Sequence, residues 1–227
     1  MKLTFLGHAC FLLETEKANI LLDPFISGNE LASNININEL KVDYILLSHG
    51  HEDHVLDAEQ IAKNNDATIV SNYEVAMWFM NTKGVEKVHP MNHGGAKQFG
   101  FGRVKMVNAV HSSMLPDGSY GGNPAGFIIE ADGKKFYYAG DTALTMDMQL
   151  IGKYDQPDVS ILPIGDNFTM GMEDALIAAD FVNTDHVIAM HFDTFPYIVT
   201  DTEKAKDLFK SKNKELTVLD IQQTIEI

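Results

Sequence analysis

Short apolar runs separated by turn residues dominate the first part of the chain. They cover residues 3–6, 10–13 and 20–22, and polar stretches divide them. Runs of this length, bounded by turn-forming residues, favour β-strands over helices. A further apolar run at 43–47 ends abruptly at Ser48 and is predicted to be a buried strand.

Helical spacing of apolar positions begins at Val55 and runs through Ala62, and nearby acidic residues favour a helix start there. Apolar positions also predict helices at 73–80, 174–182 and 202–210. The other apolar runs are predicted to be strands, at 67–70, 104–110, 126–130, 135–139, 159–162, 186–190 and 216–219.

The order of these elements indicates the fold class. A group of strands followed by mixed strands and helices occurs twice, and no linker rich in Pro, Ser or Gly divides the chain. Two sheets packed face to face, with helices outside, would bury that many apolar strands. We therefore expect an α/β fold in which residues 1–227 form one domain with two halves.

Charge and composition narrow the classes of molecule that the protein is expected to bind. The chain has 17 basic and 32 acidic residues and a net charge of −15, which disfavours nucleic acid and anionic membranes. We find no apolar segment near the roughly 20 residues needed to span a bilayer and no pattern of a cleaved signal peptide, so a cytoplasmic protein is expected. The single cysteine, Cys10, excludes an intramolecular disulfide and a thiolate metal cage, and is expected in the core.

The strongest chemical signal is the sequence Ser48-His49-Gly50-His51-Glu52-Asp53-His54, which contains the pattern H-x-H-x-D-H. It follows a predicted buried strand. In an extended segment residues i and i+2 point the same way, so His49 and His51 can bind one ion together. Gly50 lets the backbone turn sharply. Asp53 and His54 lie where a helix is expected to begin and can face a second ion.

More candidate ligands follow other predicted strands. His111 comes after the run 104–110, Asp141 after 135–139, and His191 after 186–190. Loops after such strands gather at one edge of a sheet, so these side chains are expected to complete the metal site. For Asp141 a second interpretation stays open, in which it caps a helix beginning near Ala143.

These motifs resemble those of the metallo-β-lactamase superfamily of metal-dependent hydrolases. The resemblance covers the whole chain, from Gly7-His8-Ala9 through H-x-H-x-D-H and His111 to Gly140-Asp141-Thr142 and His191. It is closest to a subfamily of small, mostly uncharacterised hydrolases related to the L-ascorbate-6-phosphate lactonases. The resemblance implies a four-layer αβ/βα sandwich with the metal ions at one edge of the two sheets.

The resemblance also implies two divalent ions. The implied ligands are His49, His51 and His111 for the first ion, Asp53, His54 and His191 for the second, and the bridging carboxylate of Asp141. Nitrogen and oxygen ligands suit zinc, the expected ion, and also manganese or iron(II). Oxygen-reducing di-iron relatives place a Glu where this chain has His51, which favours hydrolysis.

Two such ions lower the pKa of a shared water towards roughly 7, which supplies a hydroxide that bridges them. Asp53 is expected to orient this hydroxide as well as bind metal, and His8 to lie near the site as a hydrogen-bond donor or substrate contact. The expected reaction is hydrolysis of an ester, lactone or phosphodiester-type bond in a small molecule. A phosphodiesterase or nuclease acting on RNA or cyclic nucleotides, and a catalytically silent metal-binding protein, remain alternatives, and a homo-oligomer is compatible with the sequence.

The sequence also suggests roles for two loops and for the remaining histidines and methionines. The Gly-, Ser- and Pro-rich stretch 112–124 is expected to form a lid or substrate contact, and 166–170 to line the substrate site. His89 and His93 are interpreted as loop residues and His186 as structural. Four methionines are expected to fill the core, namely Met77, Met80, Met146 and Met148.

Overall fold

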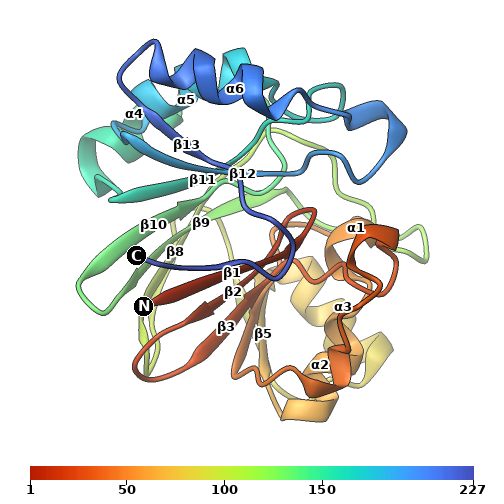
Figure 1. Ribbon diagram of the computed structural model, residues 1–227. Coiled ribbons are helices and arrows are strands. Elements are labelled where there is room, and N and C mark those ends of the chain that lie inside the picture. Colours follow the sequence, from red (N-terminus) through yellow and green to blue (C-terminus); the bar gives the residue numbers. More distant parts are fainter.

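The computed structural model describes residues 1–227 and contains two seven-stranded β-sheets. Figure 1 shows the sheets facing each other, with α4, α5 and α6 outside one sheet and α2 and α3 outside the other. The layers are therefore helix, sheet, sheet and helix. The predicted α/β sandwich of four layers is confirmed.

The first sheet has the strand order β14-β1-β2-β3-β4-β5-β6. Its strands β1–β3 form an antiparallel meander, and β3 to β6 are parallel. The strands are β1 (Lys2–Gly7), β2 (Cys10–Glu14), β3 (Asn19–Leu22), β4 (Tyr44–Leu46), β5 (Thr68–Asn72), β6 (Val88–Met91) and β14 (Thr224–Glu226). The helices along this half are α1 (Glu52–Val55), α2 (Ala58–Asn65) and α3 (Tyr73–Lys83), with short 3-10 turns at Glu30–Ala32 and Ile37–Glu39.

The second sheet has the order β13-β12-β11-β10-β9-β8-β7. Strands β7 to β10 are antiparallel and β10 to β13 are parallel. The strands are β7 (Ala96–Gln98), β8 (Gly102–Asn108), β9 (Ala125–Ala131), β10 (Lys134–Tyr138), β11 (Val159–Pro163), β12 (His186–Met190) and β13 (Glu215–Thr217). The helices are α4 (Met148–Leu150), α5 (Met172–Phe181) and α6 (Thr202–Lys210), with a π-helical turn at Ile151–Asp155 and a 3-10 turn at Pro196–Ile198.

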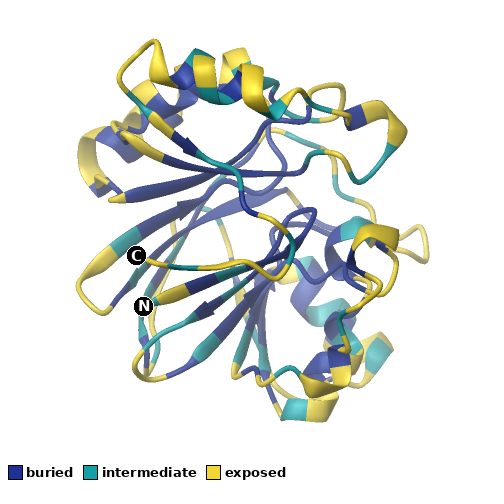
Figure 2. Cartoon of the chain, in the orientation of Figure 1, coloured by how far each residue is buried: buried dark blue, intermediate teal, exposed yellow.

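The first sheet is apolar on both faces because both faces are covered. In β3, Ile20 and Leu22 belong to a core of 44 buried residues that joins the two sheets and continues to α5 and α6. The intervening Leu21 belongs to a second core of 19 buried residues, against the helices. Figure 2 shows the buried residues concentrated between the layers. This explains why the strands of the chain appear as continuous apolar runs. None of the helices combines the length and apolar character needed to cross a membrane.

Several sequence predictions differ from the structure. Strands β6, β7 and β14 were not predicted, because all three are short, β7 and β14 are largely exposed, and β6 has a single buried residue. The predicted strand 104–110 ends at Asn108, and that at 216–219 ends at Thr217. The helix predicted from Val55 to Ala62 is divided into α1 and α2.

Two of the methionine predictions are wrong, and so is the helix near Ala143. Met146 is 65% exposed and Met80 37% exposed, whereas Met148 is buried and Met77 is partly buried. Residues 141–147 contain no helix. Within this segment Leu144 packs against the core, whereas Met146 is exposed.

Candidate metal centre

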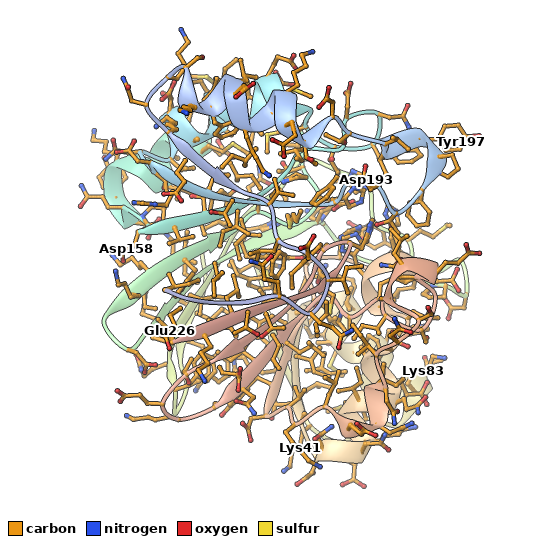
Figure 3. All side chains as sticks on the ribbon, in the orientation of Figure 1. Lys41, Lys83, Asp158, Asp193, Tyr197 and Glu226 are labelled. Atoms are coloured by element: carbon orange, nitrogen blue, oxygen red, sulfur yellow. The ribbon has the colours of Figure 1, made fainter.

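The predicted metal ligands come from both sheets and meet at one edge of the sandwich. His49 follows β4, Asp141 follows β10 and His191 follows β12 directly. His8 follows β1, and His111 comes three positions after β8 ends. Figure 3 shows Asp193, two positions after His191, at this edge among side-chain nitrogens. All seven predicted ligands and His8 lie in one cluster.

A first group consists of His49, His51 and His111, whose ligand atoms lie within 4.8 Å of one another. His49 Nε2 and His51 Nδ1 are 2.9 Å apart. The rings of His111 and His51 have centroids 5.1 Å apart and lie nearly perpendicular. The three histidines that the family resemblance assigns to a first ion therefore lie together.

A second group consists of His8, Asp53, His54 and His191, again with ligand atoms within 4.8 Å. Asp53 Oδ2 is 3.9 Å from both His54 Nε2 and His191 Nε2. His8 Nε2 is nearer to the same oxygen, at 3.1 Å. His8 thus joins the three side chains that were predicted to hold a second ion.

Asp141 lies between the two groups. Its Oδ1 is 3.3 Å from His54 Nε2, and its Oδ2 is 3.0 Å from His191 Nε2 and 3.5 Å from His111 Nε2. Because residues 141–147 contain no helix, Asp141 is not a helix cap. Its carboxylate instead contacts histidines from both groups, which is the arrangement that a bridging ligand requires.

The unpartnered atoms in this cluster test whether it suits metal. His54 Nε2, His191 Nε2 and Asp141 Oδ1 are buried and have no hydrogen-bond partner. Leaving one such atom unpaired costs about 1–3 kcal/mol, so three at one point require an explanation. Metal coordination supplies it, because these are lone-pair atoms of the types that divalent transition metals bind. The residues therefore fit metal ions.

The electrostatics agree with that fit. Burial lowers the pKa of His49, His51 and His111, so their imidazoles are neutral and their lone pairs available. Burial also opposes the charged form of His54, but the carboxylates of Asp141 and Asp53 outweigh it and raise the pKa of His54 well above its ordinary value. The cluster therefore favours a positive charge beside its carboxylates.

Asp23, which the sequence analysis did not identify, orients the two groups. This buried carboxylate accepts hydrogen bonds from the Ser48 N–H at 2.7 Å, from His54 Nδ1 at 2.8 Å and from the Tyr138 hydroxyl at 2.7 Å. It also accepts from the Ser48 hydroxyl. The ligand atoms of Asp23, His49 and His54 also lie within 4.8 Å of one another.

These bonds determine which nitrogen each histidine offers. His54 Nδ1 donates to Asp23, so Nε2 is the nitrogen that faces Asp141 and that would bind a metal ion once its proton is displaced. The single proton of the Ser48 hydroxyl goes to Asp23, so His49 Nδ1 donates to Ser48 Oγ at 2.9 Å and its Nε2 carries a lone pair that faces His51 Nδ1. Such outer partners fix the ring orientation and tautomer of metal-binding histidines. The signal for Asp23 was present, because it directly follows the apolar run 20–22.

His8 is placed to hold Asp53. Burial lowers the pKa of His8 to about 4, so the ring is neutral and carries one N–H. A carboxylate only accepts, so His8 Nε2 donates to Asp53 and Nδ1 accepts from the Thr194 hydroxyl at 2.9 Å. Hydrogen bonding and nearby histidines also keep the pKa of Asp53 low despite its burial.

Strained backbone supports the positions of two of the histidines. His8 and His191 have φ values of 58° and 55°, a left-handed region that residues with a side chain rarely adopt. The His191 N–H donates to the His8 carbonyl at 2.8 Å, which ties the two strand ends together. Such strain persists where surrounding structure enforces it, and it concentrates at functional sites.

The segment 112–124 lies against the H-x-H-x-D-H loop. The Gly50 N–H donates to Ser113 Oγ at 3.0 Å, and Ser112 Oγ is 3.3 Å from His51 Nε2. The backbone of Gly50 is not in the left-handed region, so the expected sharp turn is not its role. A Cβ at Gly50 would lie 3.2 Å from the Leu115 side chain and 3.4 Å from Gly121 Cα, so glycine allows close packing of the two segments.

The remaining histidines lie outside the cluster. His89 stacks edge-on with Phe99, His93 Nε2 lies 2.8 Å from the Pro124 carbonyl, and exposed His186 pairs with Glu215. His89 lies in β6 rather than in the expected loop. Cys10 is fully buried, as expected for a core residue.

Comparison with known proteins identifies the family. A family model described as the beta-lactamase superfamily domain matches residues 2–191. The chain belongs to the β-lactamase superfamily. Within it, the chain is 56% identical over 228 residues to a UPF0173 metal-dependent hydrolase of Christiangramia forsetii, and 43% identical over 232 residues to YtkL of Bacillus subtilis, which carries the same description. Each alignment covers 100% of both chains.

A solved structure agrees with this membership. Igni18, described as a novel metallo hydrolase from the archaeon Ignicoccus hospitalis, superposes with a TM-score of 0.87 at 33% identity. The match covers 100% of this chain and 98% of that one. The chain is therefore a metal-dependent hydrolase, as the sequence motifs predicted.

Proposed function

We propose that the chain holds two divalent metal ions and hydrolyses an ester, lactone or phosphodiester-type bond in a small molecule. The observation that carries the proposal is the position of Asp141, whose oxygens contact histidines of both groups. A single ion would leave one of the two groups without a role. Zinc is the ion we expect, and the donor set also suits manganese and iron(II).

In this proposal His49, His51 and His111 hold one ion. Asp53, His54 and His191 hold the other, and Asp141 bridges them. Bound there, the ions would lower the pKa of a water towards neutrality and polarise the oxygen under attack.

The chain's own residues prepare the site for that chemistry. Asp23 and Ser48 orient the rings of His54 and His49 through hydrogen bonds. His8 donates to Asp53 and keeps its carboxylate ionised and fixed in direction. Asp53 is the least buried of the carboxylates in the cluster, with 27% of its side chain exposed, so it is the one best placed to accept a hydrogen bond from a water molecule near the substrate.

The proposal treats residues 1–227 as one domain acting on a small molecule. The core of 44 buried residues supports this, because it contains residues from Leu3 to Leu219 and joins both halves. A nuclease is the second candidate within the class. The net charge of −15 argues against it, since affinity for nucleic-acid phosphates depends on Lys and Arg.

An activity screen tests the proposal. Zinc- or manganese-loaded protein and its metal-free form are compared on p-nitrophenyl esters, lactones and bis-p-nitrophenyl phosphate. We expect metal-dependent hydrolysis that His111→Ala abolishes and that His186→Ala leaves unchanged, because His186 is exposed and outside the cluster. Equal rates with and without metal, or equal loss in both variants, would contradict the proposal.

A further inference from the structure

The segments beside the metal centre carry exposed apolar side chains. Met114 and Tyr120, on the segment that follows His111, are 58% and 65% exposed. Phe168, after β11, is 48% exposed, and Tyr197, after β12, is 74% exposed. We call these four residues the apolar rim. Large apolar groups gathered beside a functional site commonly mark the surface that a ligand covers.

Phe168 and Tyr197 form one side of the apolar rim. Their rings meet edge to face, with centroids 6.0 Å apart, although they come from different segments. The segment of Phe168 packs on the ligands, because the Met170 N–H donates to the carbonyl of Thr142, the neighbour of Asp141. On the segment of Tyr197, the Phe195 ring lies 5.4 Å from the ring of His8. This aromatic pair therefore belongs to the surroundings of the second group.

Met114 and Tyr120 form the other side. They are joined by an antiparallel bridge within the segment 112–124. The start of that segment is fixed to the first group through Ser112 and His51. Trp78, the only tryptophan, donates to Asp117 at 2.6 Å and ties the tip of the segment to α3. Apolar side chains thus flank the two metal-binding groups on different segments.

The charged side chains on the segments of the apolar rim are all negative. Among Lys, Arg, Asp and Glu, the three segments that carry the apolar rim, 112–124, 165–171 and 192–201, contain only acidic residues. They are Asp117, Asp166, Asp193 and Asp201. A phosphate or carboxylate on the substrate, away from the bond that is cleaved, would meet carboxylates and apolar groups there. A neutral or cationic substrate would not be repelled.

We infer that the substrate is uncharged or cationic and places an aromatic-sized apolar group against Phe168 and Tyr197. This deepens the proposed function and rests on it, since it selects neutral esters and lactones over phosphodiesters and phosphorylated lactones. Exposed aromatic rings in an edge-to-face pair offer flat apolar surface that a third ring extends.

A series of matched esters tests the charge preference. Metal-loaded protein is assayed on p-nitrophenyl hexanoate, on the mono-p-nitrophenyl ester of adipic acid, and on the analogue that ends in a trimethylammonium group. We expect kcat/KM to be at least about tenfold lower for the anionic ester than for the other two, with the gap narrowing as salt screens the carboxylates. An anionic ester hydrolysed as well as the neutral one would overturn the inference.

A binding measurement tests the role of the rings without catalysis. The dissociation constant of 4-phenyl-2-butanone, a neutral ketone that cannot be hydrolysed, is measured by ligand-observed NMR. Phe168→Ser and Tyr197→Ser should each weaken binding by about two- to tenfold, the range for loss of one aromatic contact. Tyr154→Ser is the matched control, because Tyr154 is 68% exposed on the π-helical turn Ile151–Asp155, outside the segments of the apolar rim. Equal effects of all three variants, or none, would overturn the inference.

Two outcomes separate this inference from its alternatives. If the ketone binds through the apolar rim but none of the esters is hydrolysed, the proposed reaction is wrong and the binding surface stands. If Tyr197→Ser lowers the mass in sedimentation and leaves ketone binding unchanged, the apolar rim is a contact between copies of the chain and the inference is wrong.

Discussion

Replacing Asp141 by asparagine changes one oxygen of a buried carboxylate to an amide nitrogen and removes one negative charge. Asp141 is 2% exposed, and its two oxygens lie within 3.5 Å of nitrogens from three histidines. Asn has one oxygen and a poorly ligating amide. The variant therefore keeps the shape of the side chain and loses the bridge.

The expected loss is large. Removing groups that merely orient metal ligands costs 10- to 100-fold in affinity or activity. A group in contact with ligands of both ions should cost at least the upper value. We expect the rate of hydrolysis to fall at least about 100-fold, which corresponds to about 2.7 kcal/mol of transition-state stabilisation. Occupancy of at least one ion should fall with it.

The assay has two parts. Elemental analysis measures the metal content after dialysis, and kcat is measured on an ester substrate. Circular dichroism checks that the variant is folded. Asp147→Asn is the control, because Asp147 is exposed on the same segment and its carboxylate accepts a hydrogen bond only from Asn108. An Asp141→Asn protein that retains two ions and the wild-type rate would refute the bridging role.

Three further predictions follow from the surroundings of the site. Asp23→Asn weakens the orientation of His54 and should reduce zinc affinity by about 10- to 100-fold, measured by competition with a chelating dye; unchanged affinity would count against an orienting role. Gly165→Ala places a Cβ 2.1 Å from the His191 carbonyl, so it should destabilise the fold by about 1–3 kcal/mol in chemical denaturation, whereas Gly100→Ala, with nothing within 4 Å, should not. Chelation should lower the melting temperature by about 5–10 °C if metal is present at about 100 times its dissociation constant, and added zinc should restore it; superimposable thermal scans would show that no ion stabilises the fold.

The sequence indicated which side chains gather in this cluster, because several of them follow an apolar run. His49, Asp141 and His191 come soon after β4, β10 and β12, and the carboxyl ends of these strands meet at one edge. The spacing within H-x-H-x-D-H then placed His51 and Asp53 beside His49. Asp23 has the same strand-end signal, but an isolated Asp-Pro is also a common turn, so the pattern alone did not distinguish it.

The parts that could not be predicted depend on tertiary packing. The edge strand β14 is formed by three residues that pair with β1 from the other end of the chain, and its local sequence is weakly apolar. Met146 was expected in the core from its residue type, but the segment 141–147 is not helical. The exposure of Tyr197 and its pairing with Phe168 likewise follow from how two loops meet.

The number of ions held by the protein tests the two-metal centre most directly. Metal-free protein is titrated with zinc, and bound zinc per chain is measured by elemental analysis after removal of loosely held ions. We predict two zinc ions per chain, because the seven predicted ligands form two groups that Asp141 joins. A plateau at one ion or fewer under excess zinc would contradict the two-metal centre and the mechanism that depends on it.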